Sequence, residues 1–138
     1  MNFHVFLSSM DSSSVHAGNT PADFTVELAQ SIQLTGRWEC ALVDYQLTGA
    51  SIPYDPFCIC SDICEASCVG DIRLPVLRRA SFKGKKVESL VEPELPQYIG
   101  VKRDQMKRIR VYITDSKNRR FAVPGGELSC TVHFRKTL

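Results

Sequence analysis

The sequence is short of the features that mark most enzymes and membrane proteins. No apolar run approaches the roughly 20 residues of a membrane-spanning helix. Its three histidines, His4, His16 and His133, are too scattered for a metal-ligand pattern. The G-x-S-x-G motif of a nucleophile elbow and the glycine-rich loops that hold phosphate are also missing. These absences predict a protein that is not an enzyme and that has neither a cofactor nor a membrane partner.

The chain also lacks a large excess of positive or negative charge. The chain carries 17 basic and 15 acidic side chains, for a net charge of +2, which is too balanced to favour nucleic acid as a partner. The basic residues do gather in three groups, at 78–86, 102–110 and 117–120. Solvated strand faces and turns explain such groups, and the alternative is contact with nucleic acid or with an acidic partner surface.

Cysteine, by contrast, is not scarce, since the chain has six. Residues 1–14 lack the basic segment and the long apolar stretch of a signal peptide, so we expect a protein that is not secreted and whose six cysteines are reduced. Four of them, Cys58, Cys60, Cys64 and Cys68, have the spacing C-x-C-x3-C-x3-C. Structural zinc sites use CxxC pairs or a nearby His, and neither occurs here. The pattern favours thiols packed as small apolar groups, with a zinc site or a redox pair as the alternative.

Sustained helical periodicity is also missing, and only residues 102–107 could form one helical turn. Apolar and polar residues alternate instead, most regularly in 106–114 and 127–135. The predicted strands are 3–8, 23–34, 37–47, 57–64, 74–82, 87–101, 106–114 and 127–135. About eight strands with turn signals between them, in a single domain spanning 1–138, predict an all-β fold. We expect one eight-stranded antiparallel jelly-roll sandwich of two four-stranded sheets, with little helix.

The jelly-roll interpretation makes a specific prediction about pairing. Successive strands of such a fold mostly belong to opposite sheets. Strands 106–114 and 127–135 should therefore not pair with each other, and the segment between them should cross from one sheet to the other. The first strand, 3–8, should pair with the last and bring the two ends of the chain together.

The strand at 37–47 is apolar on both faces. Trp38, Cys40 and Leu42 alternate with Ala41, Val43 and Tyr45, and Cys40, like Cys130 in the last strand, is expected in the core. A strand with two apolar faces is either central and covered on both sides or part of a subunit contact.

Three stretches resemble a known family together: WECALVDYQ, SDICEASCVGDIRLPVLRR and YIGVKRDQMKRIRVYITDSKNRRFAVPGGELSCTVHFRK. Their order and spacing are similar to the minor capsid (penton) protein of Polinton/Maverick elements and of adintovirus-like and adomavirus-like DNA viruses. That family is similar in turn to the single jelly-roll portion of the adenovirus penton base. The resemblance is firmest over 34–46 and 61–135. The chain departs from it at 48–56, where many members carry a long insertion.

The resemblance implies a structural viral capsid protein that forms the pentameric vertex of an icosahedral DNA virus or virus-like transposon. Its partners would be four further copies of itself in a homopentamer and the double jelly-roll major capsid protein around the vertex. A fibre or a host receptor is a further candidate partner. The protein would reside in the virion and assemble in the nucleus or cytoplasm of the host cell.

Contacts around a five-fold axis are heterologous, so two different patches of each subunit must be complementary. The residues that we expect at this interface come from the two-faced strand, the first strand and the basic turns: Ala41, Val43, Tyr45, His4, Phe6, Arg78, Arg79, Lys85 and Lys86.

Two other functions fit an eight-stranded sandwich. One is a binding module for carbohydrate or protein, whose nearest candidate residues are Tyr54, Asp55, Phe57 and Asp71. The other is a metal-dependent enzyme of the double-stranded β-helix type, and the scattered histidines argue against it.

Overall fold

The strands of this chain form two layers. The structure is a computed structural model that describes residues 1–12, 14–48, 56–81, 90–120 and 126–137. Its strands are β1 (Asn2–Ser8), β2 (Asp23–Gln33), β3 (Trp38–Thr48), β4 (Phe57–Ser61), β5 (Ser67–Val69), β6 (Ile72–Leu74), β7 (Val76–Ala80), β8 (Ile99–Gly100), β9 (Gln105–Thr114) and β10 (Glu127–Lys136). Within the described residues, no helix is long and apolar enough to cross a bilayer.

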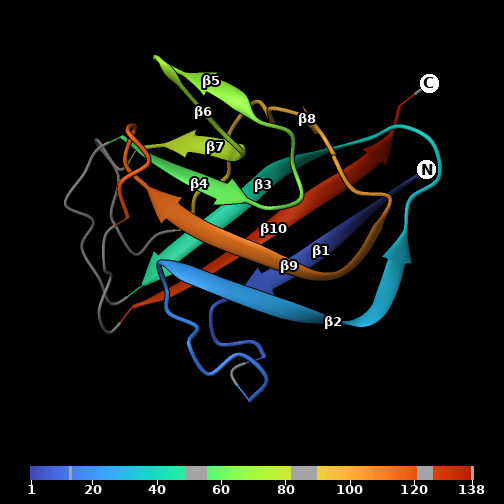
Figure 1. Cartoon of the computed structure of the whole chain (residues 1–138), viewed down its shortest axis with the longest axis horizontal. Helices are drawn as coiled ribbons and strands as arrows, with labels where there is room; N and C mark the ends of the chain where they lie inside the picture. Colours follow the sequence, from blue (N-terminus) through green and yellow to red (C-terminus); the bar gives the residue numbers. More distant parts are fainter. Residues whose placement is uncertain (13, 49–55, 82–89, 121–125, 138) are drawn as a thin grey trace.

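Two four-stranded antiparallel sheets make up the body of the protein (Figure 1). The strand order is β1-β10-β3-β8 in the first sheet, called sheet A, and β2-β9-β4-β7 in the second, called sheet B. A third, two-stranded sheet consists of β5 and β6. The prediction of an all-β sandwich with two four-stranded sheets is therefore confirmed.

The core lies between sheets A and B. The alternation in the last two strands places their apolar residues inward, because successive side chains of a strand point to opposite faces. Leu128, Val132 and Phe134 of β10 have no exposed surface, and neither do Ile109 and Ile113 of β9. The same cluster contains Cys40 and Cys130, as the sequence predicts.

The predicted pairing of the chain ends is confirmed. β1 pairs with β10 along its whole length, from Asn2 opposite Arg135 to Ser8 opposite Ser129. β9 belongs to sheet B and β10 to sheet A, so the last two strands do not pair with each other. The two ends of the chain consequently lie side by side (Figure 1), and the Lys136 amide donates a hydrogen bond to the Met1 carbonyl at 3.2 Å.

The prediction that Ala41, Val43 and Tyr45 share one face of β3 is wrong. Thr131 of β10 lies opposite Asp44, and the next residue, Val132, lies opposite Leu42, so Val43 is an extra residue in β3. Such a β-bulge shifts the alternation of all later side chains. Tyr45 therefore points into the core and is 2% exposed.

Prolines account for the largest differences from the predicted strand boundaries. The strand predicted at 74–82 is divided at Pro75 into β6 and β7, because proline cannot donate to a ladder. In its described part, the strand predicted at 87–101, which holds Pro93 and Pro96, reduces to β8 and two isolated bridges, one between Val91 and Tyr45 and one between Val101 and Cys64. Residues 82–89 lie outside the described ranges.

Two smaller predictions also fail. The strand predicted at 57–64 ends at Ser61. The helical turn predicted at 102–107 is instead the approach to β9, which begins at Gln105 and alternates exposed and buried residues at its start.

The hairpin of β5 and β6 covers the outer face of sheet B. Gly70 forms its turn with a positive φ of 62°, a conformation that glycine adopts without strain. Beneath the hairpin lies a second apolar cluster, formed by Cys58, Cys60, Leu74, Val76 and Tyr112 with Val69 and Ile72 beside it. This cover explains why every residue of β4 is buried.

Candidate interaction surface

The residues predicted at a subunit interface are not gathered in one patch. Ala41 and Tyr45 have almost no exposed surface in the single chain, so they offer nothing to a neighbour. Lys85 and Lys86 lie outside the described residues. Val43 is half-buried at the bulge of β3. The other four residues lie on two separate surfaces, one with His4 and Phe6 on β1 of sheet A and one with Arg78 and Arg79 on β7 of sheet B.

The first surface is aromatic and covers the outer side of sheet A. We call it the aromatic surface, and its residues are His4, Phe6, Tyr98, His133 and Arg135. Phe6 is 74% exposed. His4 lies directly opposite His133 in the register of β1 and β10, and their rings stack with centroids 4.5 Å apart.

Tyr98 joins this surface from the segment that precedes β8. Its hydroxyl and His133 Nδ1 are hydrogen-bonded at 2.8 Å, and the two rings meet edge to face. The Arg135 guanidinium lies 3.4 Å from the centre of the Tyr98 ring and forms an ion pair with Glu39. The cation is therefore held against a ring and a carboxylate, which fixes the aromatic groups in place.

Burial lowers the pKa of His133, and the neighbouring His4 and Arg135 lower it further. The imidazole is accordingly neutral at pH 7. The stacked rings of His4 and His133, beside the exposed Phe6 ring, offer an aromatic surface that can pack against another protein.

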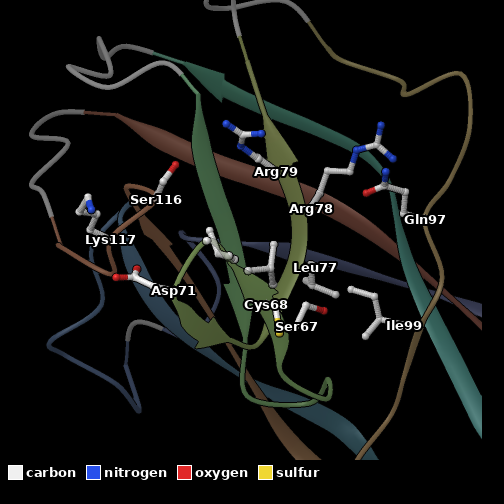
Figure 2. A pocket seen from close by; sticks show the side chains of 13 residues that line it. Ser67, Cys68, Asp71, Leu77, Arg78, Arg79, Gln97, Ile99, Ser116 and Lys117 are labelled. Atoms are coloured by element: carbon white, nitrogen blue, oxygen red, sulfur yellow. The ribbon is translucent and has the colours of Figure 1, made fainter.

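The second surface is a hollow of about 480 Å³ beside β7, called here the basic hollow (Figure 2). Its walls are Ser67, Cys68, Val69, Gly70, Asp71, Val76, Leu77, Arg78, Arg79, Gln97, Ile99, Ser116 and Lys117. Arg78 Nη1 donates to the Leu95 carbonyl at 2.8 Å, so its position is set by the chain. Arg79 and Lys117 are exposed and have no ion-pair partner in the described part of the chain. The hollow is thus suited to an acidic group.

Most other arginines of the basic groups are paired. Arg103 forms an ion pair with Asp62, Arg108 with Glu27, Arg119 with Asp115, and both Arg110 and Arg120 with Asp23. The guanidinium groups of Arg110 and Arg120 also lie over the Tyr112 ring, at 4.8 and 3.9 Å from its centre. These pairs agree with the interpretation of the basic groups as solvated strand faces and leave less free charge for an acidic partner.

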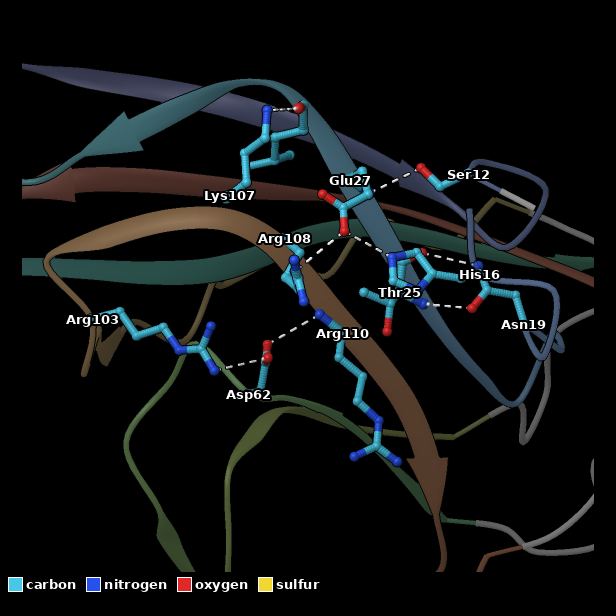
Figure 3. Close-up of polar contacts among 11 residues, drawn as sticks. Ser12, His16, Asn19, Thr25, Glu27, Asp62, Arg103, Lys107, Arg108 and Arg110 are labelled. Atoms are coloured by element: carbon cyan, nitrogen blue, oxygen red, sulfur yellow. Dashed lines mark hydrogen bonds and ion pairs between the residues drawn. The ribbon is translucent and has the colours of Figure 1, made fainter. Parts of the chain in front are cut away.

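A polar network binds the loop that precedes β2 to the edge of that strand (Figure 3). His16 Nε2 donates to Glu27 Oε1 at 2.9 Å, and Arg108 Nε lies 3.2 Å from the same oxygen. The His16 hydrogen bond, and then the charge of Arg108, lower the pKa of Glu27 despite the opposing effect of desolvation. The sequence gives this Ser-rich loop no role, because only the folded chain brings His16 next to Glu27.

The clustered cysteines do not converge. Cys58 and Cys60 lie under the β5–β6 hairpin, Cys64 is in the main core, and Cys68 is exposed. Burial raises the pKa of Cys60 to about 12 and that of Cys64 to about 11. Thiols with such pKa values stay protonated at neutral pH and behave as apolar groups. In the described part of the chain, no three His, Cys, Asp or Glu side chains are placed to hold a metal ion.

The candidate ligand residues of a binding module do not come together either. Phe57 is 1% exposed and belongs to the core, whereas Asp71 is exposed at the hairpin turn. Tyr54 and Asp55 lie outside the described ranges.

No family model matches the sequence, and no curated protein matches it.

Proposed function

We propose that this protein is a structural viral capsid protein whose homopentamer forms the vertex of an icosahedral DNA virus or virus-like transposon. The observation that carries the proposal is the nested pairing of its strands. β1 pairs with β10, β2 with β9, β3 with β8, and β4 with β7. A long hairpin of eight strands that wraps into two sheets gives this order, which supports a single jelly roll.

The resemblance to the penton family supports the same proposal from the sequence. In that family a single jelly roll is the building block of the vertex. The stretches that carry the resemblance include residues 38–46 of β3 and the whole of β9 and β10. β3 and β10 form the centre of sheet A, and β9 is a central strand of sheet B. The protein would then reside in the virion, surrounded by the double jelly-roll major capsid protein, with a fibre or host receptor as a further partner.

The basic hollow suits one half of a ring contact. A head-to-tail contact joins two different patches, so the hollow of one subunit would meet a different patch of the next. In the proposed ring, the basic hollow faces acidic residues of the neighbouring subunit. β7, beside the hollow, and β1 are edge strands of different sheets on opposite sides of the sandwich (Figure 1), so this contact leaves the edge of β1 free.

Mass measurement in solution, with electron microscopy of the purified full-length chain, tests this proposal. A mass of five subunits and rings with five-fold symmetry are expected. Arg79→Glu, in the basic hollow, should convert the rings to smaller species, whereas Arg37→Glu, an exposed arginine away from the hollow, should not. A chain that stays monomeric at its highest soluble concentration contradicts the proposal.

The alternative function is a β-sandwich binding module without catalytic activity. The basic hollow is the observation that favours it, since Arg79 and Lys117 could hold an acidic carbohydrate or peptide. A monomer that binds such a ligand through Arg79 would support the module over the capsid subunit.

A further inference from the structure

β1 and β2 are the edge strands of sheets A and B on one side of the sandwich, and they differ in how far their outer backbone groups are covered. A sheet edge presents unpaired backbone groups, which natural proteins usually cover or guard with charge. The Ile113 amide donates to the Ala22 carbonyl, so even-numbered residues of β2 face β9 and odd-numbered ones face the open side. Those odd-numbered groups are the ones that need cover.

The loop before β2 supplies that cover residue by residue. Thr20 and Asp23 exchange two backbone hydrogen bonds. The Thr25 amide donates to Asn19 Oδ1 at 3.0 Å, and Asn19 Nδ2 donates to the Thr25 carbonyl at 2.9 Å. The Glu27 amide donates to Ser12 Oγ at 2.9 Å (Figure 3). The edge of β2 is closed along this stretch.

The edge of β1 is open. The Lys136 amide donates to the Met1 carbonyl and the Ser9 amide to the Leu128 carbonyl, so odd-numbered residues of β1 face β10. The outward groups belong to Asn2, His4, Phe6 and Ser8. Among the residues that the structure describes, only Ser8 is covered: its amide donates to Asp11 Oδ2 at 3.1 Å, and its carbonyl accepts from the Asp11 amide at 3.0 Å.

The usual guards are missing from the uncovered part of β1. The backbone amides and carbonyls of Asn2, His4 and Phe6 have no partner among the described residues. The strand Asn2–Ser8 contains no charged residue and no proline, and its register with β10 runs without a bulge. An uncharged, regular and open edge is a template for another strand.

We propose that β1 pairs antiparallel with β1 of a second copy of this chain and joins two sheets A into one continuous sheet. Within a second copy, no other edge strand of the described chain fits. The loop closes the edge of β2 up to Glu27, and the pairing of β2 with β9 is irregular between Glu27 and Ile32. β5 and β6 have three residues each, and β8 has only two, with the Gly100 carbonyl already accepting from the Glu65 amide. β7 carries Arg78 and Arg79, and its register with β4 is interrupted by a bulge.

The uncovered residues are also self-complementary. With His4 opposite His4 of the second copy, Asn2 lies opposite Phe6 at both ends of the contact. All three outward residues of each strand then face outward residues of the other, and such pairs exchange about six hydrogen bonds in total. Moving the register by two residues would place Phe6 opposite His4 and bring Asn2 against Ser8, whose backbone is already occupied by Asp11.

The side chains favour the same register. β1 is uncharged, so two copies bring no like charges together. The stacked His4 and His133 pair of one aromatic surface would continue into the pair of the other. Each exposed Phe6 ring would gain a neighbour across the contact.

This two-fold contact is independent of the proposed five-fold ring. It is isologous, since the same strand meets itself, whereas a ring uses two different patches. A chain that forms both would give two rings joined through β1, and one that forms only the two-fold contact would give a dimer.

The test compares variants of the full-length chain by sedimentation equilibrium over a range of concentrations. Phe6→Lys places a charge at the open edge. His4→Pro removes the central outward amide, which β10 does not use, and proline is tolerated at such an edge position. Leu95→Lys is the matched control, because Leu95 is 79% exposed and lies outside the strands. Circular dichroism checks that each variant is folded.

Both β1 variants should weaken the two-fold association at least about tenfold, which is 1.4 kcal/mol or more. Leu95→Lys should leave it unchanged. Hydrogen exchange of residues 1–9 in the wild-type chain should slow as its concentration rises. The proposal is overturned if both β1 variants have the same mass in solution as the wild type at every concentration. It is also overturned if exchange at His4 and Phe6 is independent of concentration, or slows only when another protein is added.

If the wild-type chain forms no five-fold rings but still associates through β1, the proposed function is refuted and the β1 contact is not. If five-fold rings form but do not associate in twos, and if Phe6→Lys and His4→Pro leave their mass unchanged, the β1 contact is refuted and the proposed function is not.

Discussion

Asn19 and Thr25 form a reciprocal hydrogen-bonded pair in which a side chain takes the place of a neighbouring strand. The Thr25 amide donates to Asn19 Oδ1, and Asn19 Nδ2 donates to the Thr25 carbonyl. Replacing Asn19 by Ala should lower the free energy of unfolding by about 1–2 kcal/mol, because both backbone groups lose their partner. Urea denaturation measures this change.

Asn19→Asp is the matched control. It keeps the acceptor for the Thr25 amide and loses the donor, so its effect should lie between wild type and Asn19→Ala. If both variants unfold like the wild type, the loop does not close the edge of β2.

The bulge in β3 predicts opposite outcomes for two nearby residues. Tyr45 is in the core, so Tyr45→Ala should cost about 3–5 kcal/mol, as for other large buried rings. Val43 is the extra residue and half-buried, so Val43→Ala should stay within about 1 kcal/mol. Thermal or urea unfolding of the two variants measures both values. Equal losses would place Tyr45 and Val43 on one face, contrary to the bulge.

Asp115 organises the turn after β9. One of its carboxylate oxygens accepts from the Lys117 and Arg119 amides at 2.9 and 2.8 Å, and the other accepts from Arg119 Nε at 2.6 Å. Burial alone would raise the pKa of Asp115, but these donors and the charge of Arg119 hold it below its usual value. A carboxyl whose pKa is lower in the folded chain stabilises it above about pH 4, and this stability is lost as the pH falls further.

Asp115→Asn should therefore reduce the free energy of unfolding at neutral pH and flatten its fall on acidification. Denaturation at a series of pH values below 5 measures both effects. Asp71→Asn, at the exposed turn of the β5–β6 hairpin, should change stability at neutral pH by no more than about 0.5 kcal/mol. An unchanged acid limb in Asp115→Asn would contradict the role of these hydrogen bonds.

His133 gives a second dependence on pH, in a higher range. Its pKa is lowered by burial, His4 and Arg135, so the unfolded chain takes up a proton at a higher pH than the folded chain does. Stability should then be full above about pH 6.5 and should decrease as the pH falls toward the folded pKa. Nuclear magnetic resonance of the ring protons should show a midpoint below 6.5. In His4→Asn the midpoint should rise, and a midpoint that does not move would exclude the contribution of His4.

The six cysteines should react in two classes. Cys68 is exposed, whereas Cys40, Cys58, Cys60, Cys64 and Cys130 are buried. A thiol reagent at neutral pH should label Cys68 rapidly and the other five only on unfolding, because buried thiols with raised pKa values are unreactive. Mass spectrometry counts the labels. Cys68→Ser should abolish the rapid class, and rapid labelling of Cys58 or Cys60 would show that the β5–β6 hairpin does not protect them.

The parts of the fold that depend on strict alternation can be predicted from the residue pattern alone. The residues that β9 and β10 turn inward follow directly from period two, and so does the pairing of β1 with β10 once the chain is taken to alternate between sheets. These features are local or follow from one topological rule, so they can be predicted from the order of apolar and polar residues.

The positions where this alternation is broken, and the groups that cover each sheet edge, follow from tertiary contacts. The bulge at Val43 depends on the register of β3 with β10, which no local pattern fixes. The cover over Cys58 and Cys60 depends on where the β5–β6 hairpin folds back. The contrast between the closed edge of β2 and the open edge of β1 likewise arises from hydrogen bonds to residues distant in the chain, such as Ser12 to Glu27. Long-range contacts of this kind depend on how the whole sandwich packs, so they cannot be predicted from the local residue pattern.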